Sequence, residues 1–164
     1  MHDNSWFPAL DIRGLNGQLI LVVGCGRRPT THPGTPHCLP RTDGDWLIPL
    51  TDAYTMDVNN SMDPDRIGSF WVEDHVEDLP SNHFHAIYFE NLPKNLFEIG
   101  GWANIAARNA FRLLAGQGWV YIRTGADKST TGPIYPALAS AGFRNIHPSI
   151  DNYGVIWDIC AQKP

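Results

Sequence analysis

The sequence predicts an α/β protein with a three-layer, doubly wound, mostly parallel sheet of seven strands that ends in an antiparallel hairpin strand. Short apolar segments of strand length come before and after a segment with helical periodicity, the order expected of a parallel sheet covered by helices. Only about six residues separate the last two expected strands, which is too few for a parallel crossover and suits a hairpin.

The clearest strand is expected at residues 18–23, where Leu19 to Val23 form an uninterrupted aliphatic run. Such a run is too short for an independent helix and suits a strand that is covered on both faces. Gly24, Cys25 and Gly26 follow it directly. Glycine lets the backbone turn sharply and approach a ligand closely, and nucleotide-like ligands bind beyond the carboxyl end of such strands.

The remaining elements are expected wherever apolar runs or periodic patterns are bounded by turn formers. Further strands are expected at 53–58, 67–72, 85–90, 119–123, 143–147 and 154–161. A helix is expected over 99–115, because apolar residues recur there at intervals of three and four, and Gly116 ends it. A shorter helix is expected over 133–141.

The whole chain, residues 1–164, is expected to form one domain. Residues 1–17 combine aromatic residues with turn formers and are expected to form a short N-terminal cap over the sheet. Residues 27–50 contain five prolines and are expected to form an irregular loop. Proline removes backbone donors and clashes with the preceding helical turn, so this segment cannot be one regular helix.

Composition excludes several classes of protein. The net charge of -5, without a basic run, argues against a dedicated nucleic-acid binder. Three unpatterned cysteines argue against a disulfide framework. The sequence shows no signal peptide and no membrane-spanning run, so we expect a cytoplasmic protein without a membrane partner. The spacing of His32, His37 and Cys38 matches no zinc module, so no metal site is predicted.

Several motifs occur in an order that resembles the class I S-adenosylmethionine-dependent methyltransferases, whose fold is Rossmann-like. The resemblance spans residues 18–162 and combines a glycine motif, an Asp-Leu-Pro segment before the fourth strand, and characteristic residues around the fifth and sixth strands. These residues are Leu21 to Gly26, Asp78-Leu79-Pro80 with 84–90, Ala110 to Leu114 with 116–122, and Ala141-Gly142-Phe143.

This resemblance implies S-adenosylmethionine as a small-molecule cofactor, and methyl transfer to an acceptor that the sequence does not identify. The implied cofactor-binding residues are Gly24, Cys25, Gly26, Asp57, Asp74, His75 and Glu90. Asp57 corresponds to the acidic residue that accepts hydrogen bonds from both ribose hydroxyls. Asp74 or His75 corresponds to the contact with adenine. Glu90 is the candidate catalytic base, because methyl transfer needs alignment and sometimes a proton acceptor.

The chain also departs from the family pattern. Arg28 stands where a third small residue is usual, the loop at 27–50 replaces a helix, and His85 stands where an aspartate is frequent. These departures favour an alternative function, in which a methyltransferase-like domain without catalysis binds a protein partner. A dinucleotide dehydrogenase would need glycine at the position of Pro29 and a helix starting there, so this class is set aside.

Overall fold

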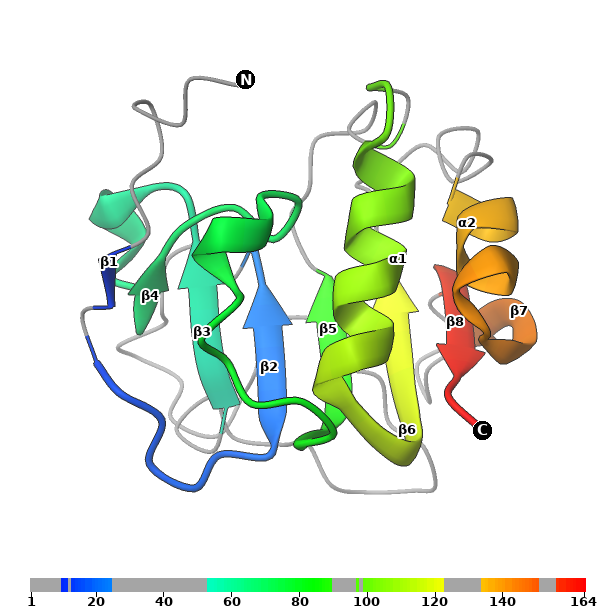
Figure 1. Cartoon of the computed structure of the whole chain (residues 1–164), viewed down its shortest axis with the longest axis horizontal. Coiled ribbons are helices and arrows are strands. Elements are labelled where there is room, and N and C mark those ends of the chain that lie inside the picture. Colours follow the sequence, from blue (N-terminus) through cyan, green and yellow to red (C-terminus); the bar gives the residue numbers. More distant parts are fainter. Residues whose placement is uncertain are drawn as a thin grey trace.

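The computed structural model describes residues 10–11, 13–24, 53–89, 97, 99–122, 134–150 and 156–164. These residues form one sheet with the strand order β1-β4-β3-β2-β5-β6-β8-β7 (Figure 1). The elements in chain order are β1 (Leu10–Asp11), β2 (Ile20–Val23), β3 (Ala53–Asp57), η3 (Asn60–Met62), β4 (Arg66–Ile67), η4 (Glu73–His75), β5 (Phe84–Phe89), α1 (Trp102–Leu113), β6 (Leu114–Ile122), α2 (Ile134–Ala141), β7 (Arg144–Ile150) and β8 (Ile156–Gln162).

The topology confirms the predicted mostly parallel sheet with an antiparallel hairpin strand at its end. Strand β2 pairs in parallel with β3 and β5, and the parallel pairing continues to β4 on one side and β6 on the other. Strand β8 lies between β6 and β7 and runs antiparallel to both. The carboxyl ends of β2, β3 and β5 therefore meet at one edge of the sheet, called here the carboxyl edge.

Strand β1 is an eighth strand that the sequence did not predict. It pairs antiparallel with β4 at the outer edge of the sheet, where Leu10 lies opposite Ile67. It belongs to the segment predicted as an N-terminal cap, so this part of the segment extends the sheet. Of the other cap residues, 13–17 are described, whereas 1–9, 12 and the whole of the predicted loop 27–50 lie outside the described residues.

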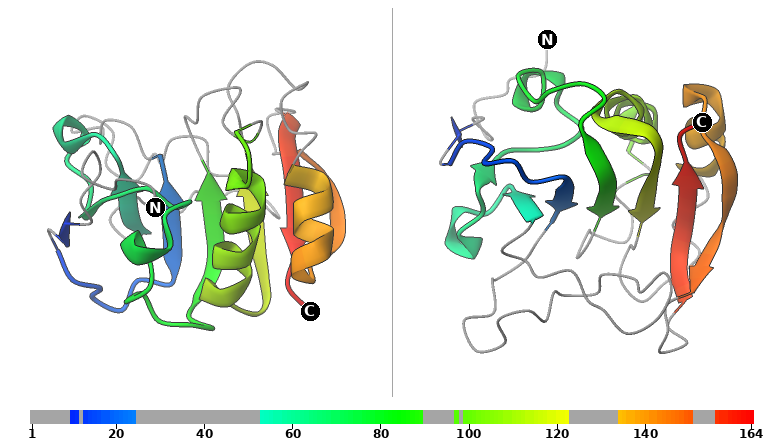
Figure 2. Two further views of the ribbon diagram at one scale, coloured as in Figure 1. Left: turned by 45° about the horizontal axis from the view of Figure 1, so that its top comes forward. Right: turned by 90° about the horizontal axis from the view of Figure 1, so that it is seen from below.

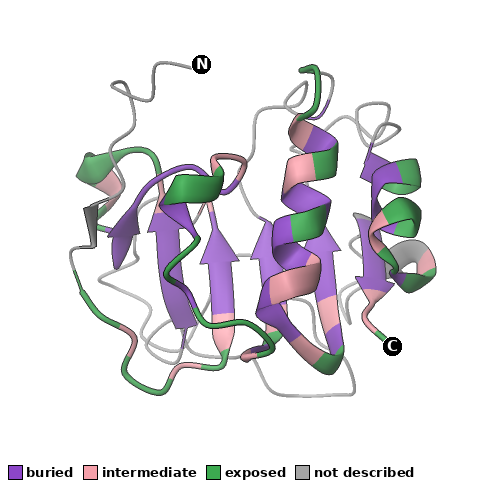
Figure 3. Cartoon of the chain, viewed as in Figure 1, coloured by how far each residue is buried: buried purple, intermediate pink, exposed green. Residues whose placement is uncertain are grey.

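Elements η4, α1 and α2 cover one face of the sheet (Figures 1 and 2). The main core lies beneath them and combines inward-facing strand residues such as Leu21, Met56 and Ile87 with the buried side of α1. The strand residues that point to the opposite face are buried as well, and Tyr88 and Tyr121 stack there with ring centroids 4.8 Å apart (Figure 3). Both α-helices in the described part of the chain, α1 and α2, lie on the first face.

Helix α1 confirms the helix predicted from periodicity, with slightly shorter ends. Its buried side consists mostly of alanines, which allow the helix to approach the sheet closely; these residues are Ala103, Ala106, Ala107, Asn109, Ala110 and Leu113. Gly101 precedes it with a φ of 81°, a conformation that favours glycine. The chain becomes extended at Leu114 and enters β6 directly.

The predicted strand 67–72 is wrong beyond Ile67, because β4 ends there and a turn follows. In this turn the Val72 amide donates to the Ser69 carbonyl at 3.1 Å. The Ser69 amide donates to Nδ1 of the buried His75 at 2.9 Å. Side-chain and turn hydrogen bonds therefore replace a strand ladder, although the residues themselves favour a strand.

Lys163 joins the end of β8 to the carboxyl-terminal end of α1. Its ammonium donates to the carbonyls of Phe111 and Leu114 at 2.7 and 2.8 Å, and to Oδ1 of Asn82 at 2.7 Å. It also lies 4.6 Å from the centroid of the Phe111 ring. Burial lowers the pKa of Lys163. The ammonium thus satisfies carbonyls that the last turn of a helix leaves without partners.

No helix among the described residues is long and apolar enough to span a membrane.

Candidate functional site

Gly24 directly follows β2 at the carboxyl edge, in a conformation suited to glycine. Its φ is +70°, where a side chain would be strained, and its amide donates to the carbonyl of Met56 at 2.8 Å. This bond holds the start of the glycine turn against β3. The other two residues of the motif, Cys25 and Gly26, lie outside the described residues.

Asp57 is the last residue of β3 and lies at the same edge. The fold therefore brings the residue predicted to bind the ribose next to Gly24. Met56, whose carbonyl receives the Gly24 amide, directly precedes Asp57. Oδ1 of Asp57 accepts a hydrogen bond from the Asn59 amide at 2.9 Å, which fixes the direction of the half-buried carboxylate. A glycine backbone and an oriented carboxylate thus occupy neighbouring strand ends, as an elongated nucleoside ligand requires.

The turn after β4, residues 68–75, forms the next part of the carboxyl edge. The Gly68 amide donates to the carbonyl of Asp57 at 3.0 Å, so the turn begins directly beside that residue. A Cβ at Gly68 would approach Met56 Cε to 3.0 Å and the His75 Cβ to 3.3 Å. Glycine therefore lets the chain pass closely over the core at this point.

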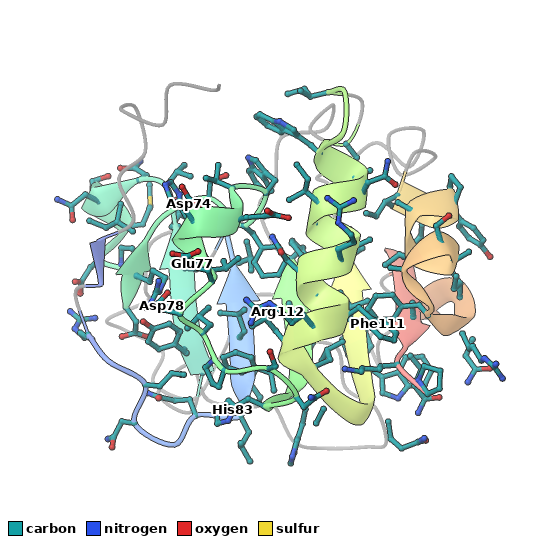
Figure 4. All side chains as sticks on the ribbon, in the orientation of Figure 1. Asp74, Glu77, Asp78, His83, Phe111 and Arg112 are labelled. Atoms are coloured by element: carbon teal, nitrogen blue, oxygen red, sulfur yellow. The ribbon has the colours of Figure 1, made fainter. Side chains whose placement is uncertain are left out.

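The two residues predicted to contact adenine lie very differently. Asp74 is exposed on η4 (Figure 4). His75 is only 2% exposed, and burial lowers its pKa. Because Nδ1 of His75 accepts the Ser69 amide, the neutral ring carries its proton on Nε2. The His75 side chain therefore holds the turn from inside, and Asp74 is the one of the two whose side chain reaches the surface.

Ser69 is a site residue that the sequence reasoning missed. Its hydroxyl is buried in this turn and has no hydrogen-bond partner among the described residues. Buried polar groups without a partner are rare and call for a specific explanation. The prediction placed Ser69 within a strand, so no signal in the sequence marked it as part of the turn.

The Asp-Leu-Pro motif has a structural role that the resemblance did not indicate. Asp78 forms a bidentate ion pair with Arg66 of β4, with both N–O distances at 2.8 Å. The hydrogen bonds from Arg66 hold the pKa of Asp78 below its usual value. Although burial opposes the charge of Arg66, its bonds to Asp78 and Tyr54 raise its pKa overall. The motif thereby fastens the segment after η4 to the sheet.

Helix α1 holds the same segment from the other side. Arg112 donates to the carbonyls of Val76 and Leu79 at 2.6 and 2.8 Å, and in Figure 4 its side chain points toward that segment. Asn109 donates to the Phe70 carbonyl at 2.7 Å from a buried position. The turn and the segment behind it are thus fixed to both β4 and α1.

An aromatic pair lies where the turn meets the beginning of α1. Trp71 and Trp102 stack with ring centroids 5.4 Å apart and an interplanar angle of 19°. Both are partly exposed, and nearby Ile99, whose carbonyl accepts the Trp102 amide, is 44% exposed. This end of the molecule therefore presents apolar surface next to the carboxyl edge.

Metal binding and thiol chemistry find little support in the described residues. They contain no group of three His, Cys, Asp or Glu side chains that could hold a metal ion. Burial raises the pKa of the Cys160 thiol to about 11, which keeps it protonated and poorly nucleophilic at neutral pH. Glu90, the predicted catalytic base, lies outside the described residues; it directly follows Phe89, the last residue of β5.

Comparison with solved structures establishes the fold. The chain is similar to a TehB-like SAM-dependent methyltransferase from Corynebacterium glutamicum, with a TM-score of 0.57 and 13% identity over 92% of this chain and 83% of that one. It is also similar to a SAM-dependent methyltransferase from Archaeoglobus fulgidus, with a TM-score of 0.53 and 10% identity over 88% and 85% of the two chains. The chain thus has the class I methyltransferase fold. No family model and no curated protein matches its sequence.

Proposed function

We propose that the protein binds S-adenosylmethionine at the carboxyl edge and transfers its methyl group to an acceptor. The observation that carries this proposal is the pairing of Gly24, in a left-handed conformation, with Asp57 at the next strand end. In a class I methyltransferase fold, these positions fit the two parts of the cofactor that resemblance assigns to them. The glycine backbone would lie against the amino-acid portion and the carboxylate would accept the ribose hydroxyls.

When bound, S-adenosylmethionine supplies an electrophilic methyl group. The chain's own contribution is to orient the two reactants and to exclude water, since direct displacement depends mainly on alignment. Gly24 and Asp57 would orient the cofactor, together with Cys25 and Gly26. Glu90 would accept the acceptor's proton where the acceptor is an alcohol or amine, because a carboxylate beside the reacting atoms can act as a general base.

Calorimetric titration with S-adenosylmethionine and S-adenosylhomocysteine tests the proposal. We expect micromolar binding to the wild type and at least about tenfold weaker binding to Asp57→Ala, because the ribose loses acceptors in a partly buried place. Glu77→Ala is the matched control, since it removes one exposed carboxylate from the segment that follows η4 (Figure 4). Equal affinity of wild type and Asp57→Ala would overturn the role of Asp57.

The alternative function is binding of a protein partner by a domain that lacks catalysis. The partly exposed Trp71–Trp102 pair beside Ile99 favours it, because clustered apolar surface often marks an interaction site. Absence of binding to either cofactor form would favour this alternative, and pull-down with wild type and a Trp71→Ala variant would then test it. The expected cytoplasmic location stays a prediction, and cell fractionation would test it.

A further inference from the structure

The position of the ligand proposed above places its nucleobase beside the turn 68–75, and the inference drawn here rests on that proposed function. Strand β3 lies between β2 and β4 in the sheet. A ligand with its amino-acid part at Gly24 and its ribose at Asp57 therefore extends next toward the residues that follow β4. Gly68, the first of these, is bonded through its amide to the Asp57 carbonyl at 3.0 Å.

The turn is held in place by a short chain of contacts that starts at Asp78. The Asp78 carboxylate binds both terminal nitrogens of Arg66, whose side chain is only 3% exposed. The same Nη1 atom of Arg66 donates to the carbonyl of His75 at 3.0 Å. Nδ1 of His75 accepts the amide of Ser69 at 2.9 Å. One exposed carboxylate is thus linked, through a buried arginine and a buried histidine, to the backbone beside Asp57.

Removing Asp78 would leave the charge of Arg66 without its counter-ion in a buried place. A buried charge without a partner is strongly unfavourable, so the guanidinium would move toward water. It would then lose its hydrogen bond to the His75 carbonyl, and the turn would lose the contact that ties His75 to β4. Asp78 itself is far less buried than Arg66, with 57% of its side chain exposed. A substitution there changes the contact without opening the core.

We propose that Arg66 and Asp78 are positioning residues for recognition of the nucleobase. Their ion pair holds the backbone of the turn 68–75 beside Asp57, through the bond from Arg66 to the His75 carbonyl. Neither residue contacts the ligand; both act through His75 and Ser69. The pair therefore sets how well the protein distinguishes adenine from a base with a different hydrogen-bonding edge.

The test is the selectivity between two nucleobases. A general loss of stability leaves this selectivity unchanged in a protein that remains folded. The two probes are S-adenosylhomocysteine and its deaminated analogue S-inosylhomocysteine, which carries a carbonyl oxygen in place of the adenine amino group. The measured quantity is the ratio of their dissociation constants, obtained by calorimetry at a temperature where each variant is folded. Wild type is expected to prefer the adenine form, since donors and acceptors that fit one base are left unpaired by the other.

Asp78→Asn is expected to reduce this selectivity ratio about fivefold and to weaken binding of S-adenosylhomocysteine. Asp78→Glu keeps the carboxylate and is expected to restore part of the ratio. The double variant Arg66→Met with Asp78→Asn removes the buried charge together with its partner, which protects the fold. This variant is expected to show the same reduced ratio as Asp78→Asn.

Lys163→Met is the matched control. It removes a cation with three hydrogen bonds from the opposite end of α1, so it lowers stability without touching the turn. Its selectivity ratio is expected to equal that of wild type. A wild-type ratio in Asp78→Asn and in the double variant would overturn the positioning role alone. Failure of wild type to bind either probe would overturn the proposed function, and this inference with it.

Discussion

Replacing Lys163 by methionine tests whether one side chain fastens the carboxyl-terminal strand to α1. Methionine keeps a similar length and apolar stem but removes the ammonium. The carbonyls of Phe111 and Leu114 and Oδ1 of Asn82 lose a donor at 2.7 to 2.8 Å, and the Phe111 ring loses a cation 4.6 Å from its centroid.

The expected loss follows from these contacts. Each hydrogen bond contributes about 1 kcal/mol net, and the attraction of a cation to a helix carboxyl terminus about 0.5 kcal/mol. The cation–π contact contributes a similar amount, about 0.5 kcal/mol. Because burial lowers the pKa of Lys163, desolvation of the ammonium offsets part of the sum. We expect the free energy of unfolding to fall by about 3 kcal/mol, and the Tm by about 6 to 12 °C.

Urea unfolding followed by far-ultraviolet circular dichroism measures this free energy. Arg108→Met is the control, because it removes a cation from α1 itself, and Arg108 is 60% exposed and pairs with Glu73 only at 3.8 Å. Such an exposed pair contributes less than about 0.5 kcal/mol. If Lys163→Met lost no more stability than Arg108→Met, the contacts of Lys163 would have no net stabilising effect and the reasoning would be wrong.

Three further predictions concern His75, Gly142 and Cys160. Burial lowers the pKa of His75 below its ordinary 6.5, so the native state binds fewer protons than the unfolded state. The contribution of the neutral His75 side chain to stability is therefore present above about pH 6.5, and it is lost as the pH falls through the lowered pKa. Urea unfolding between pH 5 and pH 8 should show this dependence, and His75→Asn should reduce it; an equal dependence in both proteins would count against it. Gly142→Ala should destabilise by about 1 to 3 kcal/mol, since its φ is +108° and the new Cβ would lie 3.1 Å from the Phe111 ring; an unchanged Tm would refute this. In a Cys25→Ser, Cys38→Ser background, Cys160 should react with a thiol reagent only upon unfolding, because it is buried and its pKa is raised to about 11; rapid labelling of the folded protein would contradict the prediction.

The sequence predicted those parts of the fold that local patterns determine. Strand β2 was predicted because its aliphatic residues are contiguous, and α1 because its apolar residues recur at helical spacing. Strand β1 is only two residues long, which is too short to leave a pattern. The wrongly predicted strand at 68–72 is apolar enough for a strand, but two hydrogen bonds hold it as a turn: His75 Nδ1 accepts the Ser69 amide, and the Asn109 side chain donates to the Phe70 carbonyl. Such tertiary contacts leave no periodic signal.

For the candidate site, the sequence indicated the two residues at the strand ends but not the contacts behind them. Gly24 and Asp57 were assigned from motifs, and the parallel order of β2 and β3 brings them together. The role of His75 could not be predicted, because residue type alone does not tell whether a histidine faces a ligand or the core. The partner of Asp78 was equally hidden, since Arg66 lies 12 residues away and on a different element.

Strand β8 lies between β6 and β7 in the sheet, although it follows β7 in the sequence. Strand β7 pairs with β8 and reaches the rest of the sheet only through it, while β8 itself pairs with β6. A sheet extended in simple chain order would have added β7 directly beside β6. In this sheet β8 lies between β6 and β7 instead, and it runs antiparallel to both. The pairing of β6 with β8 therefore joins residues far apart in the sequence, and long-range pairings of this kind slow folding.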